Sequence, residues 1–172
     1  MIGIESKTKN NYLNSALIKE NLNKNPIFPI RFGIHQDFVP TIIAIEKYNY
    51  ILTGDMKGIV VQYLLDGHTG KVIKNYGDIG IGQLYSSAKL GRLAVFGGNY
   101  SEIVFIDTLT KQILFERIKV AIKVIYSLEF CIMDKKNNKV LLSISGCGSD
   151  YSDNKTDLLD VSAICKSLNL ME

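Results

Sequence analysis

The segment YILTGDMKGIVVQY, residues 50–63, recurs in altered form as AVFGGNYSEIVFI, residues 94–106. In both copies an apolar run ends in glycine, a polar turn follows, and a second apolar run begins. Gly97 stands 43 residues after Gly54 when the copies are aligned. A self-similar unit with a period of about 40 to 45 residues indicates a repeat protein in which every unit is one supersecondary structure.

A weaker third copy, VLLSISGCGSD at residues 140–150, follows the insertion DKKNN. It places Ser145-Gly146 where Thr53-Gly54 stands in the first copy. The sequence therefore predicts one repeat domain, residues 29–172, with units near 33–76, 77–118 and 119–170. Residues 1–28 are rich in Lys, Asn and Ser, and we expect them to form a polar N-terminal arm.

Between the turns lie apolar runs of about four to seven residues, rich in Ile, Val, Tyr and Phe. Runs of this length and composition at regular spacing predict strands of an all-β fold. The runs Ile59–Tyr63 and Ile103–Ile106 are apolar almost throughout, which is typical of strands covered on both faces.

The tail allows two interpretations. TDLLDVS, from Thr156, fits a further strand of the last unit. Leu158, Val161, Cys165 and Leu168 are spaced by three and four residues, which fits an amphipathic helix with Thr156 as its N-cap.

The order of these features resembles the WD-repeat β-propeller family. Its repeat runs from a Gly-His pair through a first strand, a small-residue second strand, a tight turn and a third strand ending in Trp-Asp. The matching positions here are Gly33-Ile34-His35, Leu52-Thr53-Gly54, Lys57-Gly58 and Ile59–Tyr63 in one unit, with Gly97-Gly98 and Ile106-Asp107 in the next. The resemblance implies antiparallel four-stranded sheets arranged as blades, a structural network of His35, Thr53 and Tyr63, and a scaffold that binds other proteins.

The chain departs from the family pattern at several of the motif positions. It has no Trp, and Tyr63 stands where the first Trp is expected. Lys57 occupies the place of the turn Asp, with Asp55 two residues earlier. Four blades would need about 160 to 180 residues, and only about two and a half are legible. The N-terminal arm, a partner, or the remainder of a longer chain would complete the ring, and the last is the preferred hypothesis.

Composition and charge restrict the kinds of partner that the chain requires. The chain has 172 residues, 47% of them hydrophobic, and a formal net charge of +3, which fits a folded domain and requires no nucleic-acid partner. No apolar stretch is long enough to cross a membrane, and the first residues lack the apolar core of a secretory signal. Three widely spaced cysteines fit no zinc or disulfide pattern, so we expect reduced thiols and a cytoplasmic location.

No catalytic motif is complete, so the sequence predicts no enzyme, cofactor or metal site. The alternative is a nucleotide-binding enzyme domain that uses Gly77, Gly80 and Gly82. That fold requires a third motif glycine where Tyr85 stands, and a helix where Gln83–Leu90 offers about two turns.

Candidate protein-binding residues are Met56 and Lys57 in one turn, and Asn99 and Tyr100 in the equivalent turn of the next unit. Loop tips on a rigid scaffold commonly carry binding function, and aromatic and basic side chains supply much of the affinity.

Overall fold

The computed structural model describes residues 34–65, 70–114, 117–134, 137, 139–148 and 152–170. The chain divides into two units, residues 1–31 and residues 32–172, and every described residue belongs to the second. The predicted polar arm, residues 1–28, therefore lies outside the described residues, as does Gly33 of the Gly-His motif.

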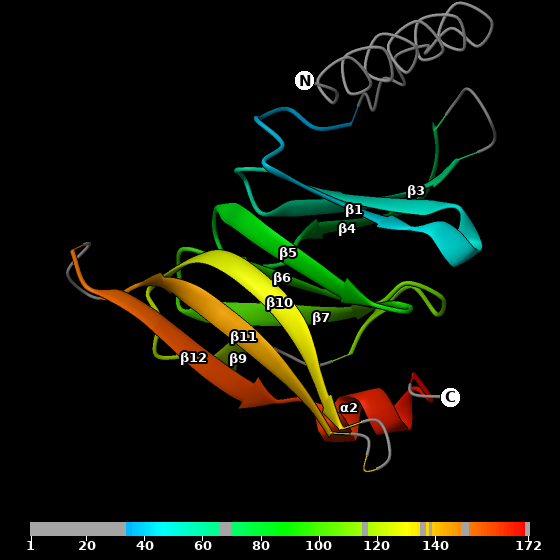
Figure 1. Cartoon of the computed structure of the whole chain (residues 1–172). Helices are drawn as coiled ribbons and strands as arrows, with labels where there is room; N and C mark the ends of the chain where they lie inside the picture. Colours follow the sequence, from blue (N-terminus) through cyan, green and yellow to red (C-terminus); the bar gives the residue numbers. More distant parts are fainter. Residues whose placement is uncertain are drawn as a thin grey trace, which may run out of the picture. The chain divides into compact units, whose positions relative to one another are not determined.

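The described strands form three antiparallel sheets, which follow one another along the chain (Figure 1). The first sheet contains β1 (Thr41–Ile45), β2 (Tyr50–Gly54), β3 (Ile59–Leu65) and β4 (Gly70–Asp78), with a short 3-10 helix η1 (Glu46–Tyr48) between β1 and β2. The second contains β5 (Leu84–Leu90), β6 (Leu93–Gly98), β7 (Glu102–Asp107), β8 (Gln112–Ile113) and β9 (Ile118–Lys119). The third contains β10 (Val124–Asp134), β11 (Lys139–Cys147) and β12 (Asn154–Asp160), and the helix α2 (Ser162–Ser167) follows. The all-β, antiparallel prediction is confirmed.

Only the first sheet has the four strands that were predicted for each unit. The second has five, because its outer strand is divided into β8 and β9, which both pair with β7. The third has three, because the chain turns into α2 after Asp160 instead of adding a fourth strand. None of the sheets closes on itself.

Each interpretation of the tail describes one part of it. Residues 154–160 pair with β11 as a strand, and the helix starts only at Ser162. Thr156 lies in β12, so it is not an N-cap. The Asp160 carboxylate accepts hydrogen bonds from the Ser162 amide, at 2.9 Å, and from its hydroxyl, at 2.5 Å, where the strand gives way to the helix.

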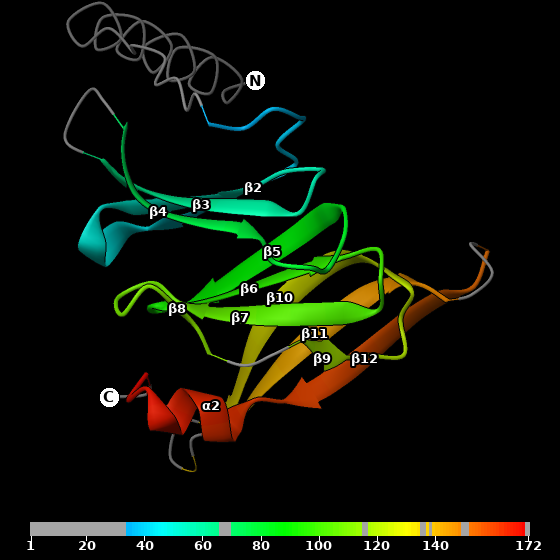
Figure 2. The ribbon, with the colours of Figure 1, turned by 180° about the vertical axis from the view of Figure 1, so that it is seen from behind.

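The hydrophobic core consists of two layers, one on each face of the second sheet. Alternate residues of β6 and β7 point to opposite faces, as the pleat requires. Ala94, Phe96, Val104 and Ile106 pack with residues of the first sheet, whereas Leu93, Val95, Ile103 and Phe105 pack with the third. Figure 2 shows the second sheet between the other two. Residues 103–106 are buried throughout, which confirms that this strand is covered on both faces.

The repeated glycine of the second strand lies where one sheet meets the next. A Cβ atom on Gly54 would come within 2.7 Å of Leu84 Cδ1 in the second sheet. One on Gly97 would come within 2.9 Å of Ile125 Cγ2 in the third. A side chain at either position would therefore push the neighbouring sheets apart.

The third copy does not align with the first two as predicted. Ser86 pairs with Gly97 after a bulge in β5, and Ser127 pairs with Ser145 after the corresponding bulge in β10. Ser145 therefore takes the position of Gly97, and Gly146 corresponds to Gly98. The alignment was wrong by one residue because Ser145-Gly146 resembles Thr53-Gly54 in sequence, whereas the strand pairing places Gly146 opposite Ile125 as Gly98 lies opposite Leu84.

Candidate functional site: a loop surface and the network beneath it

Three connections meet at one end of the first two sheets. They are the β2–β3 turn, residues 55–58, the β4–β5 connection, residues 79–83, and the β6–β7 turn, residues 99–101. A Cβ atom on Gly58 would lie 2.9 Å from the carbonyl oxygen of Gly82, and one on Gly82 would lie 2.6 Å from the ring of Tyr100. The two predicted loop tips thus lie on either side of Gly82. We call these three connections the loop surface.

The four predicted binding residues differ in what they offer a partner. Tyr100 is 63% exposed, and Lys57 is exposed as well. Asn99 is half-buried, and its Oδ1 accepts a hydrogen bond from the Gln83 amide at 3.1 Å. Met56 is also half-buried, and its amide donates to the carbonyl oxygen of Phe38 at 2.9 Å. Tyr100 and Lys57 are therefore available for contact, whereas Asn99 and Met56 fix the loops.

The glycines of the nucleotide-binding alternative have a local explanation. Gly77, Gly80 and Gly82 all have positive φ, between 68° and 76°, where a side chain would be strained. The Arg117 guanidinium donates to the Gly80 carbonyl oxygen at 3.0 Å and lies 3.5 Å from Glu102. The residues that a dinucleotide site would need as a helix, up to Leu90, form β5 instead, so the expected two turns of helix are absent from this described segment. The geometry does not favour a phosphate site here.

A buried hydrogen-bond network lies directly behind the β2–β3 turn. His35 Nδ1 donates to Asp55 Oδ2 at 2.8 Å, and His35 Nε2 lies 2.5 Å from Thr53 Oγ1. The side chains of His35 and Asp55 are 4% and 0% exposed. Burial raises the pKa of Tyr63, and a hydrogen bond with Thr53 opposes that shift. The structure thus brings together His35, Thr53 and Tyr63, the residues of the predicted structural network.

Asp55 is the member of this network that the sequence comparison with the family did not place. Its Oδ1 also accepts the amides of Lys57, at 2.9 Å, and of Ile59, at 3.0 Å. One carboxylate therefore ties His35 to the turn that presents Lys57. The family pattern would place the Asp of this network at position 57. Here Asp55, two residues earlier, reaches His35 instead. An acidic residue directly after a buried strand was the available signal.

Asp107, at the position of the family's Trp-Asp, has a different role in the second sheet. It is buried, its Oδ1 accepts the Leu109 amide at 3.0 Å, and the same oxygen lies 3.4 Å from Arg92 Nε. Asp107 therefore fixes the turn after β7, and among the described residues it forms no hydrogen bond with a histidine.

The three cysteines form neither a disulfide nor part of a metal-ligand cluster in the described part of the chain. Cys131, Cys147 and Cys165 are all free, and no group of His, Cys, Asp and Glu among the described residues could hold a metal ion. None of the described helices is long and apolar enough to cross a membrane.

The thiols are expected to react at very different rates. Burial raises the pKa of Cys165, and the negative charge of Asp160 raises it further, so less thiolate forms in mildly alkaline solution. Cys147 is only 1% exposed, whereas Cys131 is partly exposed. A disulfide reagent that releases a coloured thiolate should label only Cys131 rapidly in the native chain, and all of the thiols in denaturant. Rapid native labelling of Cys165 would contradict this burial pattern.

The chain matches no protein-family model and no curated protein.

Proposed function

We propose that the chain is a non-enzymatic protein-binding module built from WD-repeat-like β-propeller blades. The observation that carries this proposal is the repetition of one packing step. Gly54 of the first sheet lies against Leu84 of the second, and Gly97 of the second lies in the same way against Ile125 of the third. The first strands also follow one another, because β5 lies next to both β1 and β10 (Figure 1). A stack generated by repeating one step is the arrangement from which propellers are built.

The buried network supports the same proposal. In the WD-repeat family a His, a Ser or Thr, an Asp and a Trp join the strands of one blade. Here His35, Thr53 and Asp55 form the first three members, and Tyr63 takes the place of Trp.

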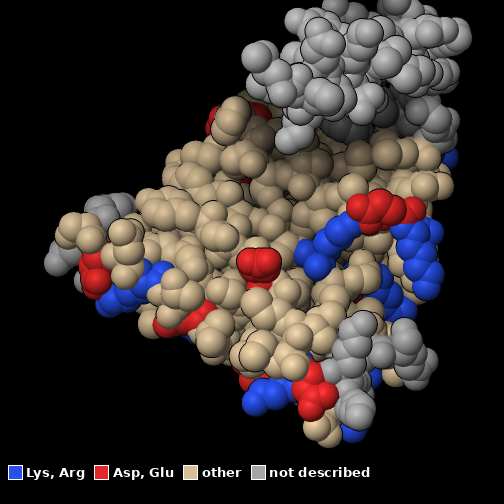
Figure 3. Space-filling model, in the orientation of Figure 1, with Lys and Arg blue, Asp and Glu red and all other residues tan. Residues whose placement is uncertain are grey.

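We further propose that more blades, from a longer chain or from a partner, cover the outer face of the third sheet. This sheet exposes large side chains, with Tyr126 55%, Met133 62% and Leu158 64% exposed. Figure 3 shows that the face over β5 and β10 carries few charged side chains. Large exposed apolar groups on a surface with few charges are typical of an interface.

Partner proteins would bind at the loop surface, through Tyr100 and Lys57. An exposed aromatic ring and an exposed cation on fixed loops are suited to recognition. Asp55, His35 and Thr53 are linked in the order of a catalytic triad, but all three side chains are buried, which favours a structural role for them. The cytoplasm is the compartment we propose, since it would keep the thiols reduced.

The loop surface is tested by comparing partner recovery between variants. The immobilised 172-residue chain should recover at least one protein from an extract, and Lys57→Glu and Tyr100→Ala should each reduce its recovery by about tenfold. Lys166→Glu on α2 makes the same charge change at an exposed position outside the loop surface and should leave recovery unchanged. Unchanged recovery with both loop variants would refute the assignment.

A further inference from the structure

A second surface lies between the outer strands of the first two sheets. A hollow of about 340 Å³ separates β4 from β8. Its lining comprises Lys74, Asn75, Tyr76, Lys111, Gln112 and Ile113. Within the described strands, β4 pairs only with β3, and β8 only with β7. Both walls of this groove are therefore sheet edges, with main-chain groups that face no further strand in the described part of the chain.

Hydrogen bonds fix the position of the two walls. The Tyr76 hydroxyl donates to Gln62 Oε1 at 2.6 Å, and Gln62 Nε2 donates to the carbonyl oxygen of Thr108 at 2.8 Å. Thr108 in turn donates to the carbonyl oxygen of Arg92 through both its amide and its hydroxyl. Gln62 is fully buried, so this chain of bonds joins the first sheet to the second beneath the groove. Burial and the nearby Asp107 raise the pKa of Tyr76 well above its usual range, so its hydroxyl stays protonated and keeps donating.

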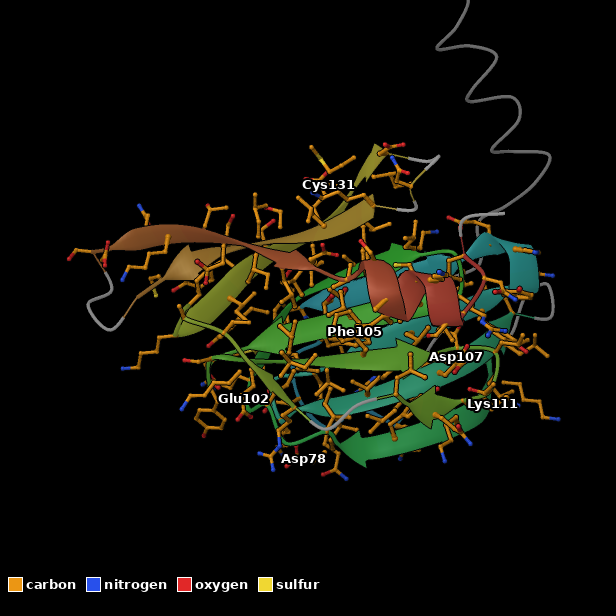
Figure 4. All side chains as sticks on the ribbon, turned by 90° about the horizontal axis from the view of Figure 1, so that it is seen from below. Asp78, Glu102, Phe105, Asp107, Lys111 and Cys131 are labelled. Atoms are coloured by element: carbon orange, nitrogen blue, oxygen red, sulfur yellow. The ribbon has the colours of Figure 1, made fainter. Side chains whose placement is uncertain are left out.

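Among the described residues that line the groove, two are lysines and none carries a carboxylate. Lys74 Nζ lies 5.8 Å from the centre of the Tyr76 ring, and in the described part of the chain neither Lys74 nor Lys111 forms an ion pair. The nearest buried acid, Asp107, is engaged by Arg92 and the Leu109 amide. In Figure 4, Lys111 lies close to Asp107, at the other end of the second sheet from Glu102. The groove is thus distinct from the loop surface.

We propose that this groove binds an acidic protein segment in extended conformation, with its carboxylates on Lys74 and Lys111. Sheet edges pair with extended peptides through main-chain hydrogen bonds, and two cations that form no ion pair with a described residue select for acidic side chains. The side chain of Ile113, which is 44% exposed and lines the groove, provides apolar contact beside the cations. Single-stranded nucleic acid is less suited, because the Tyr76 ring is half-buried and its hydroxyl is already bonded, so it offers no open stacking platform.

The test uses the 172-residue chain and a fluorescein-labelled peptide of four Val-Glu repeats, with binding followed by fluorescence anisotropy. The peptide should bind, and Lys74→Glu/Lys111→Glu should weaken its binding by about tenfold. Both lysines are on the surface, so the melting temperature of the variant should stay close to that of the parent chain.

Lys139→Glu/Lys166→Glu is the matched control, since it makes the same charge change at two exposed positions outside both the groove and the loop surface. It should alter peptide affinity by less than about twofold. The proposal is overturned if the peptide does not bind, if both double variants lose affinity equally, or if a Val-Lys peptide binds as tightly. It is also overturned if a thymidine oligonucleotide binds more tightly than the acidic peptide and Lys74→Glu/Lys111→Glu abolishes that binding. Because Lys74 and Lys111 are not part of the loop surface, these outcomes are independent of partner recovery through Tyr100.

Discussion

Replacing Asp55 by alanine is expected to lower the free energy of unfolding by about 3 to 5 kcal/mol. The Asp55 carboxylate is fully buried and accepts hydrogen bonds from His35 Nδ1 and from the amides of Lys57 and Ile59. Alanine would leave these donors without a partner in a place that water does not reach, and an unsatisfied buried donor is strongly unfavourable. Chemical denaturation followed by circular dichroism measures the loss.

Asp37→Ala provides the matched control. Asp37 is exposed, and its carboxylate accepts only the neighbouring Phe38 amide in the described contacts, at 2.7 Å. This variant should change the free energy of unfolding by less than about 0.5 kcal/mol. If Asp55→Ala and Asp37→Ala differ by less than about 1 kcal/mol, the buried network does not stabilise the first sheet in the way the hydrogen bonds indicate.

The network also links stability to the proposed binding function. Asp55 accepts the amide of Lys57, so the carboxylate that anchors His35 inside the sheet also sets the turn that presents Lys57 outside it. A variant that keeps its fold but loosens this turn should therefore bind its partner less well. The Asp55 side chain therefore belongs both to the buried network and to the exposed turn that carries Lys57.

The repeat predicted the sheets because their packing depends on local features that sequence records. Small residues at Gly54 and Gly97 mark the contacts between sheets, and the fully apolar run at residues 103–106 marks a strand with two buried faces. The connections between the strands are short, so sequence neighbours became neighbours in the sheets. The same alignment pairs the turns at residues 55–58 and 99–101, and these equivalent turns lie at the same end of the first two sheets.

Other features depend on contacts that no local pattern records. The strand pairing places Gly146 opposite Ile125, as it places Gly98 opposite Leu84, so Gly146 matches Gly98 and not Gly97. Lys74 and Lys111 line one groove only because the first and second sheets stack and place their outer strands, β4 and β8, side by side. Similarly, the choice between strand and helix in the tail was settled by seven residue pairs between β11 and β12, which hold residues 154–160 in the third sheet.

The second large effect is expected at Gly146, where alanine should lower the free energy of unfolding by about 3 kcal/mol or more. An ideal Cβ atom there would lie 1.9 Å from the carbonyl oxygen of Val124 and 2.7 Å from Ile122 Cγ2. The first of these atoms is main chain, so no side-chain rotation relieves the collision and the start of β10 must move. Gly98 has the same surroundings, with a Cβ position 2.3 Å from the Gln83 carbonyl oxygen, so Gly98→Ala should have a similar effect.

Gly77→Ala separates this collision from the general effect of losing a glycine. Gly77 has a φ of 68°, but a Cβ atom there would meet nothing within 4 Å. Alanine should therefore impose only backbone strain, about 1 to 2 kcal/mol. Denaturation of the three variants under the same conditions should rank Gly146→Ala and Gly98→Ala well below Gly77→Ala in stability. Equal stabilities would mean that β10 and β11 tolerate a wider separation at Gly146, and the correspondence between Gly98 and Gly146 would then lose its physical basis.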